Sequence, residues 1–319
     1  MSTTLLDFEQ PLAELELCYD ALSEYAQADP GTFGEALNLL GEKIHALKEQ
    51  FVSNMTPWEK VRMARHPMRP QPVDFCRMIF TDFLELHGDR RFRDDRAIIG
   101  GFAMLENEPV MVILTQKGHN LREYNETHFG MGEPEGYRKA LRLMRLAEKA
   151  RRPIITLVDT PGAYPGIGGE ERHVGEAIAS NLRDMFRLTV PVICVITGEG
   201  GSGGALALAV GNRVLILANA YYSVITPEGC AAILWRSPEK TAEAANALKL
   251  TAQDLLELKV VDEIVPEPLG GAHRDPAAAA QALREALIRN MKTLLKRSGS
   301  GLKADRYKRF RKLGKWKED

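Results

Sequence analysis

Val158-Asp159-Thr160-Pro161-Gly162-Ala163-Tyr164-Pro165-Gly166-Ile167-Gly168-Gly169 is a glycine-rich turn that follows an apolar, β-branched run. A second turn, Thr197-Gly198-Glu199-Gly200-Gly201-Ser202-Gly203-Gly204-Ala205, follows a similar run further along the chain. Both apolar runs, 153–158 and 191–196, begin at a proline, and both turns precede a helical pattern. Strands that alternate with helices predict a mainly parallel α/β core. Its active edge should be the one where strands pass into helices.

The glycines allow these two turns to bind a ligand through their main chain. Without Cβ atoms, a turn can bring bare backbone N–H groups close to a ligand. Two such turns on neighbouring strands could bind one oxyanion from both sides. The sequence therefore predicts a site made of main-chain donors at this edge of the sheet.

Bulk composition excludes several other classes of protein. The chain has 319 residues, 45% of them hydrophobic, and a net charge of -1, which argues against a general nucleic-acid or membrane binder. No apolar run approaches the roughly 20 residues needed to cross a bilayer, and the hydrophilic N-terminus lacks a signal-peptide pattern. The four cysteines are far apart and contain no Cys-x-x-Cys pair. We expect a reduced, cytoplasmic protein without a metal site of its own.

The chain divides into three predicted parts. Residues 1–60 contain a helical hairpin over 7–51, interrupted at Asp29-Pro30-Gly31, which we interpret as a packing or assembly element. Residues 61–296 form the main domain, and residues 297–319 form a basic tail behind a hinge at 298–301. The tail is expected either to be solvated or disordered, or to dock on an acidic partner surface.

Local patterns predict the elements of the main domain. Residues 55–72 are predicted to be an irregular connection. Strands are expected at 97–105, 109–114, 153–158, 191–196 and 213–217, with a further extended segment at 222–226 and a short run at 260–265. Helices are expected at 73–85, 137–150, 170–187 and 204–210, and through most of the remainder.

One alternative is a serine hydrolase. Gly200-Gly201-Ser202-Gly203-Gly204 matches the Gly-x-Ser-x-Gly nucleophile elbow. Such an enzyme needs a base, and only His173 is near either turn in sequence, while His273 lies in an apparent turn. We favour Ser202 as a small residue beside backbone donors. The Walker pattern is absent, so nucleotide hydrolysis is not expected.

Several cations could bind an anion. Arg138, Arg142, Arg145 and Lys149 follow one side of the predicted helix 137–150, and are either a solvated face or a site for phosphates or a carboxylate. Lys117 stands at a strand end, where an anion contact and a purely structural role are equally open. The histidines of the polar loop, His119 and His128, are expected to be exposed.

Three segments together carry a family resemblance. They are the first turn, the stretch 198–206 and Tyr222-Ser223-Val224-Ile225-Thr226-Pro227-Glu228-Gly229-Cys230. The chain resembles the carboxyltransferase α subunits of bacterial acetyl-CoA carboxylase. Segments 6–11, 134–142 and 266–274 agree as well, whereas the loop 120–129 and the tail after about Leu295 differ.

The resemblance implies a crotonase-like α/β fold, a spiral of β-β-α repeats. It implies transfer of a carboxyl group from carboxybiotin, held on a biotin carboxyl carrier protein, to acetyl-CoA, giving malonyl-CoA for fatty acid biosynthesis. Family members act with a β subunit that carries a zinc ribbon, as an α2β2 assembly, and with a biotin carboxylase. This chain has no cysteine spacing for the ribbon and no biotin attachment site, since Asn290-Met291-Lys292-Thr293 is a poor match.

The resemblance also implies roles for individual residues. Carboxyl transfer develops negative charge on the thioester and biotin ureido oxygens, which calls for N–H donors rather than a nucleophile. This subunit's donors would serve biotin. The candidate donors are Gly162, Ala163, Gly203 and Gly204. The candidate substrate-binding residues are Lys117, Tyr164, Arg172, Ser202 and Glu228.

Two other acyl-CoA activities remain as alternatives. One is a carboxyltransferase for a different acyl-CoA, such as propionyl-CoA. The other is an enoyl-CoA hydratase or isomerase of the same fold. Those hydratases place a glutamate where this chain has Ala205, while Glu228 falls near the position of their second carboxylate.

Overall fold

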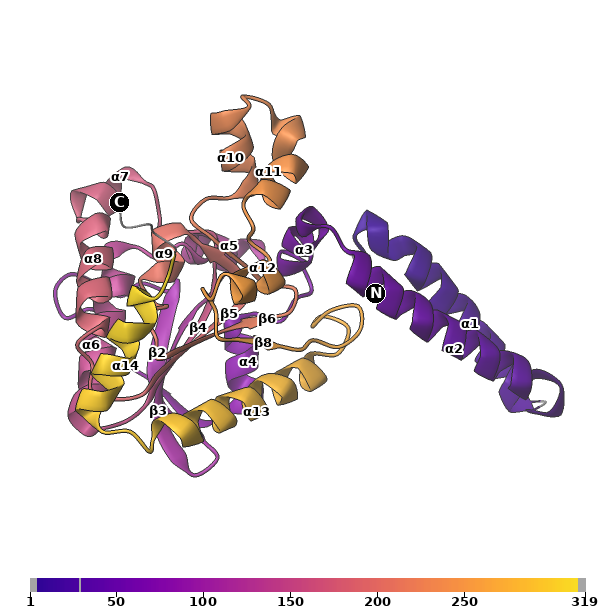
Figure 1. Cartoon of the computed structure of the whole chain (residues 1–319), viewed down its shortest axis with the longest axis horizontal. Coiled ribbons are helices and arrows are strands. Elements are labelled where there is room, and N and C mark those ends of the chain that lie inside the picture. Colours follow the sequence, from indigo (N-terminus) through magenta and orange to yellow (C-terminus); the bar gives the residue numbers. More distant parts are fainter. Residues whose placement is uncertain (1–4, 29, 315–319) are drawn as a thin grey trace, which may run out of the picture.

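A computed structural model describes residues 5–28 and 30–314. Its body is a mixed sheet with helices on both faces, and a helical hairpin projects from one side (Figure 1). Asp29, in the predicted break of the hairpin, and residues 315–319 of the predicted tail lie outside the described residues.

The sheet has an antiparallel edge and a parallel centre. Within the described residues it contains eight strands, ordered β1-β2-β3-β4-β5-β6-β8, with β7 paired to β5. Strands β1 to β3 are antiparallel neighbours, and β3 to β6 and β8 run parallel. The first half of β5 pairs with β6 and its last three residues pair with β7. The strands are β1 (Thr81–Glu85), β2 (Ile98–Leu105), β3 (Glu108–Thr115), β4 (Ile154–Thr160), β5 (Val192–Gly201), β6 (Arg213–Leu217), β7 (Tyr221–Ser223) and β8 (Glu263–Val265).

Helices cover both faces of the sheet, and β4 and β5 are therefore buried along their whole length. Helix α6 packs on α8, β2 and β3, while α13 and α4 pack together and against central strands. Among the described residues, no helix combines the length and apolar character needed to cross a membrane. The helices of the body are α3 (Pro57–Ala64), α4 (Pro72–Ile79), α5 (Leu121–Glu126), α6 (Pro134–Ala150), α7 (Ile167–Glu171), α8 (Val174–Met185), α9 (Ser202–Leu206), α10 (Pro227–Leu234), α11 (Thr241–Ala247), α12 (Ala252–Glu257), α13 (Pro276–Leu294) and α14 (Gly299–Arg311), with 3-10 turns η2 (His128–Gly130) and η3 (Pro238–Lys240).

The predicted hairpin is formed by α1 (Gln10–Ala28) and α2 (Pro30–Asn54), preceded by the 3-10 turn η1 (Asp7–Glu9). Its base is attached to the body through Glu9, which is buried between two histidines. The Glu9 carboxylate lies 3.3 Å from His66 Nε2 and 2.9 Å from His273 Nε2. Burial raises the pKa of Glu9, but the hydrogen bonds from His273 and His66 outweigh it and hold that pKa well below its usual range.

Several predicted boundaries were wrong. The helix expected at 73–85 ends at Ile79, and β1 follows after Phe80, whose backbone is extended. The connection expected at 55–72 contains α3, which begins at a Thr56 capping box. The polar loop after Gly118 contains α5 and η2. These elements are short, so their hydrophobic periodicity is weak.

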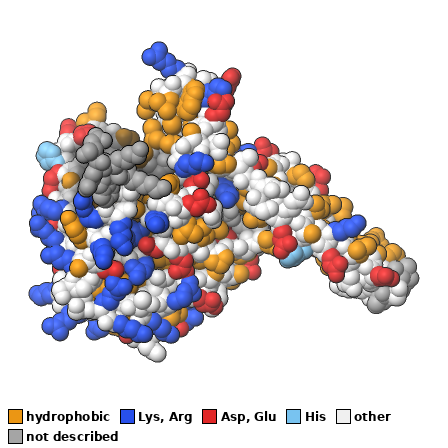
Figure 2. All heavy atoms as spheres, in the orientation of Figure 1, with side chains coloured by type: hydrophobic (Ala, Val, Ile, Leu, Met, Phe, Trp, Pro, Cys, Tyr) orange, Lys and Arg blue, Asp and Glu red, His pale blue; other side chains and the backbone are white. Residues whose placement is uncertain are grey.

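The basic segment is a packed helix over most of its described length, not a solvated tail. Ser298 caps α14, so the expected hinge is the start of a helix. Leu302 and Arg306 are buried. The Arg306 guanidinium donates to the carbonyl oxygens of Met185 and Leu188 and to Asn212 Oδ1. The outward side of α14 carries the Lys and Arg side chains seen in Figure 2.

Candidate active site

The two glycine turns meet, as the sequence predicted. Strands β4 and β5 are parallel neighbours, and Thr160 pairs with Gly200 near the carboxyl ends of the two strands. A Cβ on Gly204 would lie 2.4 Å from the carbonyl carbon of Gly162, and one on Gly201 would lie 2.1 Å from Pro161 O. The turns therefore pack backbone against backbone, at a distance that only glycine permits.

The four predicted donors lie together but differ in accessibility. Gly162 and Gly204 are buried, whereas Ala163 and Gly203 are partly exposed. The Gly162 N–H already donates to Thr160 Oγ1 at 3.2 Å. Gly203 lies in the first turn of α9, where N–H groups have no acceptor within the helix. Ala163 and Gly203 are therefore the donors best placed to reach a ligand.

Ser202 has the backbone of an elbow residue, but no base is hydrogen-bonded to it in the described part of the chain. Its φ is +53° and its side chain is exposed at the β5–α9 junction. His173 caps α8 in a left-handed conformation, and His273 is hydrogen-bonded to Glu9 at the hairpin base. Among the hydrogen bonds of residues 5–28 and 30–314, none joins Ser202 to a histidine or a lysine. The hydrolase alternative therefore has no structural support.

Lys117 joins the ends of the two strands that carry the turns. Its Nζ lies 2.6 Å from Asp159 Oδ1 and 2.6 Å from Glu199 Oε2. The Asp159 carboxylate also accepts the Glu199 N–H at 2.8 Å. Burial raises the pKa of Glu199, but Lys117 and Arg65 more than offset this and bring it to about 2. The charge of Lys117 is thus balanced by two carboxylates, and its evident role is to position both turns.

Arg65 extends this network to the rim of the site. Its Nε donates to Glu199 Oε1 at 2.6 Å, and its guanidinium also pairs with Glu228. The buried Tyr221 hydroxyl donates to Glu199 at 2.7 Å. The predicted substrate residue Glu228 is therefore ion-paired at the start of α10.

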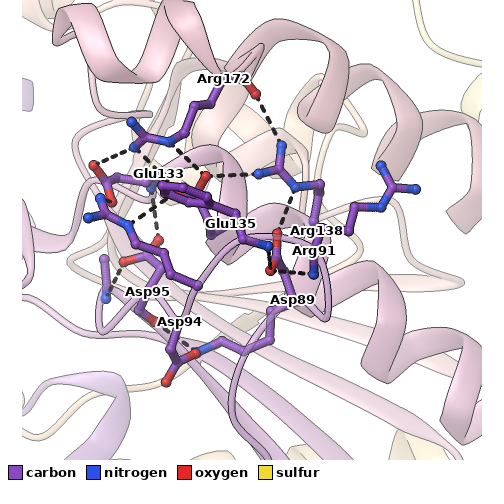
Figure 3. Close-up of polar contacts among 12 residues, drawn as sticks. Asp89, Arg91, Asp94, Asp95, Glu133, Glu135, Arg138 and Arg172 are labelled. Carbon is purple, nitrogen blue, oxygen red and sulfur yellow. Dashed lines mark hydrogen bonds and ion pairs between the residues drawn. The ribbon is translucent and has the colours of Figure 1, made fainter.

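Of the other two predicted substrate residues, Tyr164 belongs to the first turn and Arg172 follows it in the chain. Arg172 pairs with Glu133 at 3.0 Å and with Glu135 at 2.8 Å (Figure 3). Its charge is therefore shared with two carboxylates, and its role as a substrate-binding residue stays a prediction. The Tyr164 ring stacks on His128 with centroids 4.1 Å apart. His128, expected to be exposed, is thus held against the turn.

Sequence reasoning missed the buried charges beneath the turns. Asp159, Glu199 and Arg65 were given no role, although two of them lie within the quoted turns. The available signal was an acidic residue near the end of each of two otherwise apolar strands, where burial demands a partner. Arg65 and Tyr221 had no such signal, because only the tertiary fold brings them to Glu199.

Comparison with solved structures defines the class of protein. A transcarboxylase 12S structure with methylmalonyl-coenzyme A bound superposes with a TM-score of 0.57 at 20% identity, covering 70% of this chain and 42% of that one. A Pseudomonas malonate decarboxylase hetero-tetramer in complex with coenzyme A gives 0.56 at 19% identity, covering 68% and 86%. The fold is the predicted crotonase-like α/β fold.

Comparison of sequences gives the family. The family described as "Acetyl co-enzyme A carboxylase carboxyltransferase-like" matches residues 5–314. Acetyl-coenzyme A carboxylase carboxyl transferase subunit alpha of Geobacter metallireducens is 56% identical, covering 98% of each chain. The subunit of the same name from Thermus thermophilus is 53% identical, covering 98% of this chain and 99% of the relative. The chain belongs to this carboxyltransferase α-subunit family, which confirms the resemblance.

Proposed function

We propose that this chain is the α subunit of a biotin-dependent carboxyltransferase that moves a carboxyl group from carboxybiotin to acetyl-CoA, forming malonyl-CoA. The observation that carries the proposal is the pair of glycine turns packed backbone on backbone, with Ala163 and Gly203 accessible and, among residues 5–28 and 30–314, no histidine or lysine hydrogen-bonded to Ser202. Membership of the carboxyltransferase family supports the same reaction.

The chemistry needs what these turns can supply. Biotin that loses its carboxyl group carries negative charge on its ureido oxygen, which preorganised N–H donors stabilise. In our proposal Ala163 and Gly203 bind this oxygen, and the buried Gly162 and Gly204 maintain the contact between the turns. Lys117 holds Asp159 and Glu199, so both strand ends keep a fixed separation. Biotin reaches the site on a carrier protein, in the cytoplasm.

A partner subunit would complete the site. The arm formed by α10 and α11 stands out from the body, and hydrophobic side chains gather on it (Figures 1 and 2). Ile233 and Leu234 on this arm are 69% and 67% exposed. Apolar side chains exposed together favour a protein interface. We assign the partner as a zinc-bearing β subunit in an α2β2 assembly that works with a biotin carboxylase.

The hydratase alternative is weaker at the residue level. Ala205 is fully buried in α9, so the position offers neither a carboxylate nor space for one. Glu228 is engaged by Arg65. Within the described residues, these two positions therefore offer no free carboxylate for a hydratase.

The test is reconstitution with a β subunit and measurement of malonyl-CoA formation from acetyl-CoA, with carboxybiocytin as the carboxyl donor. Ser202→Ala keeps every main-chain donor, so activity should stay within a few-fold. Gly204→Val should lower kcat by roughly 10²-fold or more, the scale of a lost oxyanion donor. The reverse ranking would indicate a serine nucleophile and refute the proposal.

A further inference from the structure

A basic cavity lies outside the glycine turns, between α6, α8 and the loop 87–91. Its volume is about 360 Å³. Arg138, Arg142 and Arg145 of α6 belong to its lining, so much of the arginine row of that helix borders a cavity that is open to solvent on one side. The lining residues are Asp89, Arg90, Arg91, Arg138, Leu141, Arg142, Arg145, Glu176, Ala177, Ser180, Asn181 and Arg183.

Two arginines are held together in the cavity by a shared main-chain acceptor. Arg90 Nη1 and Arg142 Nη2 both donate to His87 O, at 2.9 and 3.1 Å, and Arg142 Nε donates to Gly88 O at 3.0 Å. Neither arginine forms an ion pair with a carboxylate of residues 5–28 or 30–314. Burial and the neighbouring Arg90 guanidinium lower the pKa of Arg142. Like charges brought this close are unfavourable unless an anion binds between them.

The loop that carries Arg90 is held in one conformation by hydrogen bonds to the Asp89 carboxylate. The Asp89 carboxylate accepts the N–H groups of Arg91 and Phe92 at 2.9 and 2.8 Å, and Arg138 Nε at 2.9 Å (Figure 3). Arg90 itself has a φ of +63°, a strained conformation for a residue with a Cβ. The surrounding contacts therefore fix the direction of the Arg90 side chain.

Positive charge is in excess throughout the lining. Six arginines face two carboxylates, Asp89 and Glu176. Asp89 is saturated by the loop and by Arg138, and Glu176 accepts the Ser180 hydroxyl at 2.7 Å. Arg145 and Arg183 share Asp184. Arg90, Arg91 and Arg142 are left to bind an external anion.

We propose that this cavity binds the phosphoryl groups of a small-molecule diphosphate, with Arg90 and Arg142 as the principal contacts. Guanidinium groups bind phosphate oxygens through paired hydrogen bonds in a fixed fork, which suits two converging arginines. The volume exceeds what one phosphate needs and falls within the range of small-ligand pockets.

Two sources could supply this chemistry. One is the nucleotide end of coenzyme A, in which case the site contributes to the proposed reaction. The other is a free phosphorylated metabolite. The proposal itself does not rest on the transferase function, because the binding measurement uses this chain alone.

The experiment measures binding of inorganic pyrophosphate to the full chain by isothermal titration calorimetry. The double variant Arg90→Gln/Arg142→Gln should weaken binding at least about tenfold, because charge-assisted hydrogen bonds are lost. The matched control is Arg151→Gln/Arg152→Gln, which removes the same charge at exposed positions outside the cavity and should bind like the wild type. Circular dichroism checks that each variant is folded.

A second arm separates the sources in the reconstituted enzyme. If coenzyme A is the ligand, the double variant should raise KM for acetyl-CoA several-fold, and 3′-dephospho-acetyl-CoA, which keeps the diphosphate, should show a similar rise. If a free metabolite is the ligand, KM stays unchanged while pyrophosphate binding is still lost. The proposal is overturned if pyrophosphate fails to bind, or binds wild type, pocket variant and control equally. Loss of partner binding without any pyrophosphate binding would assign the arginines to an acidic protein surface instead, and would equally overturn it.

Discussion

Individual glycines in the two turns differ in how much space is available for a side chain. A Cβ on Gly204 would lie 2.6 Å from Ala163 N, whereas one on Gly203 would meet only Ile178, at 3.7 Å. Gly204→Ala should therefore push the turns apart and lower kcat by roughly 10²-fold, the scale of a displaced oxyanion donor. Gly203→Ala should stay within a few-fold. Steady-state malonyl-CoA formation by the reconstituted enzyme measures both, and equal losses would show that the close contact is unimportant.

Glu199 should make stability depend on pH. Its folded pKa of about 2 is below the ordinary value of 4.5, because Lys117 and Arg65 outweigh the effect of burial. A carboxyl group with a lowered folded pKa stabilises the fold above pH 4.5 and loses this contribution as the pH falls toward 2. At pH 6 the free energy of unfolding of the wild type should exceed that of Glu199→Gln by a few kcal/mol. This difference should shrink below about pH 4.5. Urea unfolding at several pH values measures it, and a constant difference would contradict the assigned pKa.

At the scale of elements, α14 depends on one buried arginine. Arg306 is fully buried and satisfies carbonyl oxygens of the α8–β5 connection as well as Asn212. Arg306→Leu would leave these acceptors unpaired and should cost at least about 2 kcal/mol of unfolding free energy. Lys303→Leu, at an exposed position of the same helix, should change it by less than about 0.5 kcal/mol. Denaturant unfolding measures the loss of unfolding free energy in both variants. Similar losses in Arg306→Leu and Lys303→Leu would mean that α14 adds little to stability.

At the scale of the whole molecule, we propose that the site is half of one shared with a partner subunit. This chain offers one set of main-chain donors, and the thioester needs a second set. Purified alone, the chain should not transfer the carboxyl group of carboxybiocytin to acetyl-CoA, and adding a β subunit should restore activity. Activity of the isolated chain would disprove the shared site. Because the assay uses only the purified subunits, it separates this question from the role of the basic cavity.

The sequence by itself determined the α/β class, the two glycine turns and the family, because these depend on local patterns. An apolar run between a proline and a glycine cluster predicts a buried strand wherever it occurs. The contact between the turns was also predictable, since consecutive parallel strands are usually neighbours. Short elements such as β1 and α3 were missed because a few residues carry little periodicity.

Only the tertiary structure decided what the charged residues do. Lys117 and Arg172 were candidate substrate-binding residues in the sequence, and the fold brings Asp159 and Glu199 to Lys117 and Glu133 and Glu135 to Arg172. Conversely, part of the α6 arginine row borders a cavity only because the loop 87–91 and α8 close over it. The basic C-terminal segment is likewise a packed helix only because the fold provides partners for its buried residues Leu302 and Arg306. The effect of a charge depends on its partners, and long-range folding alone chooses those partners.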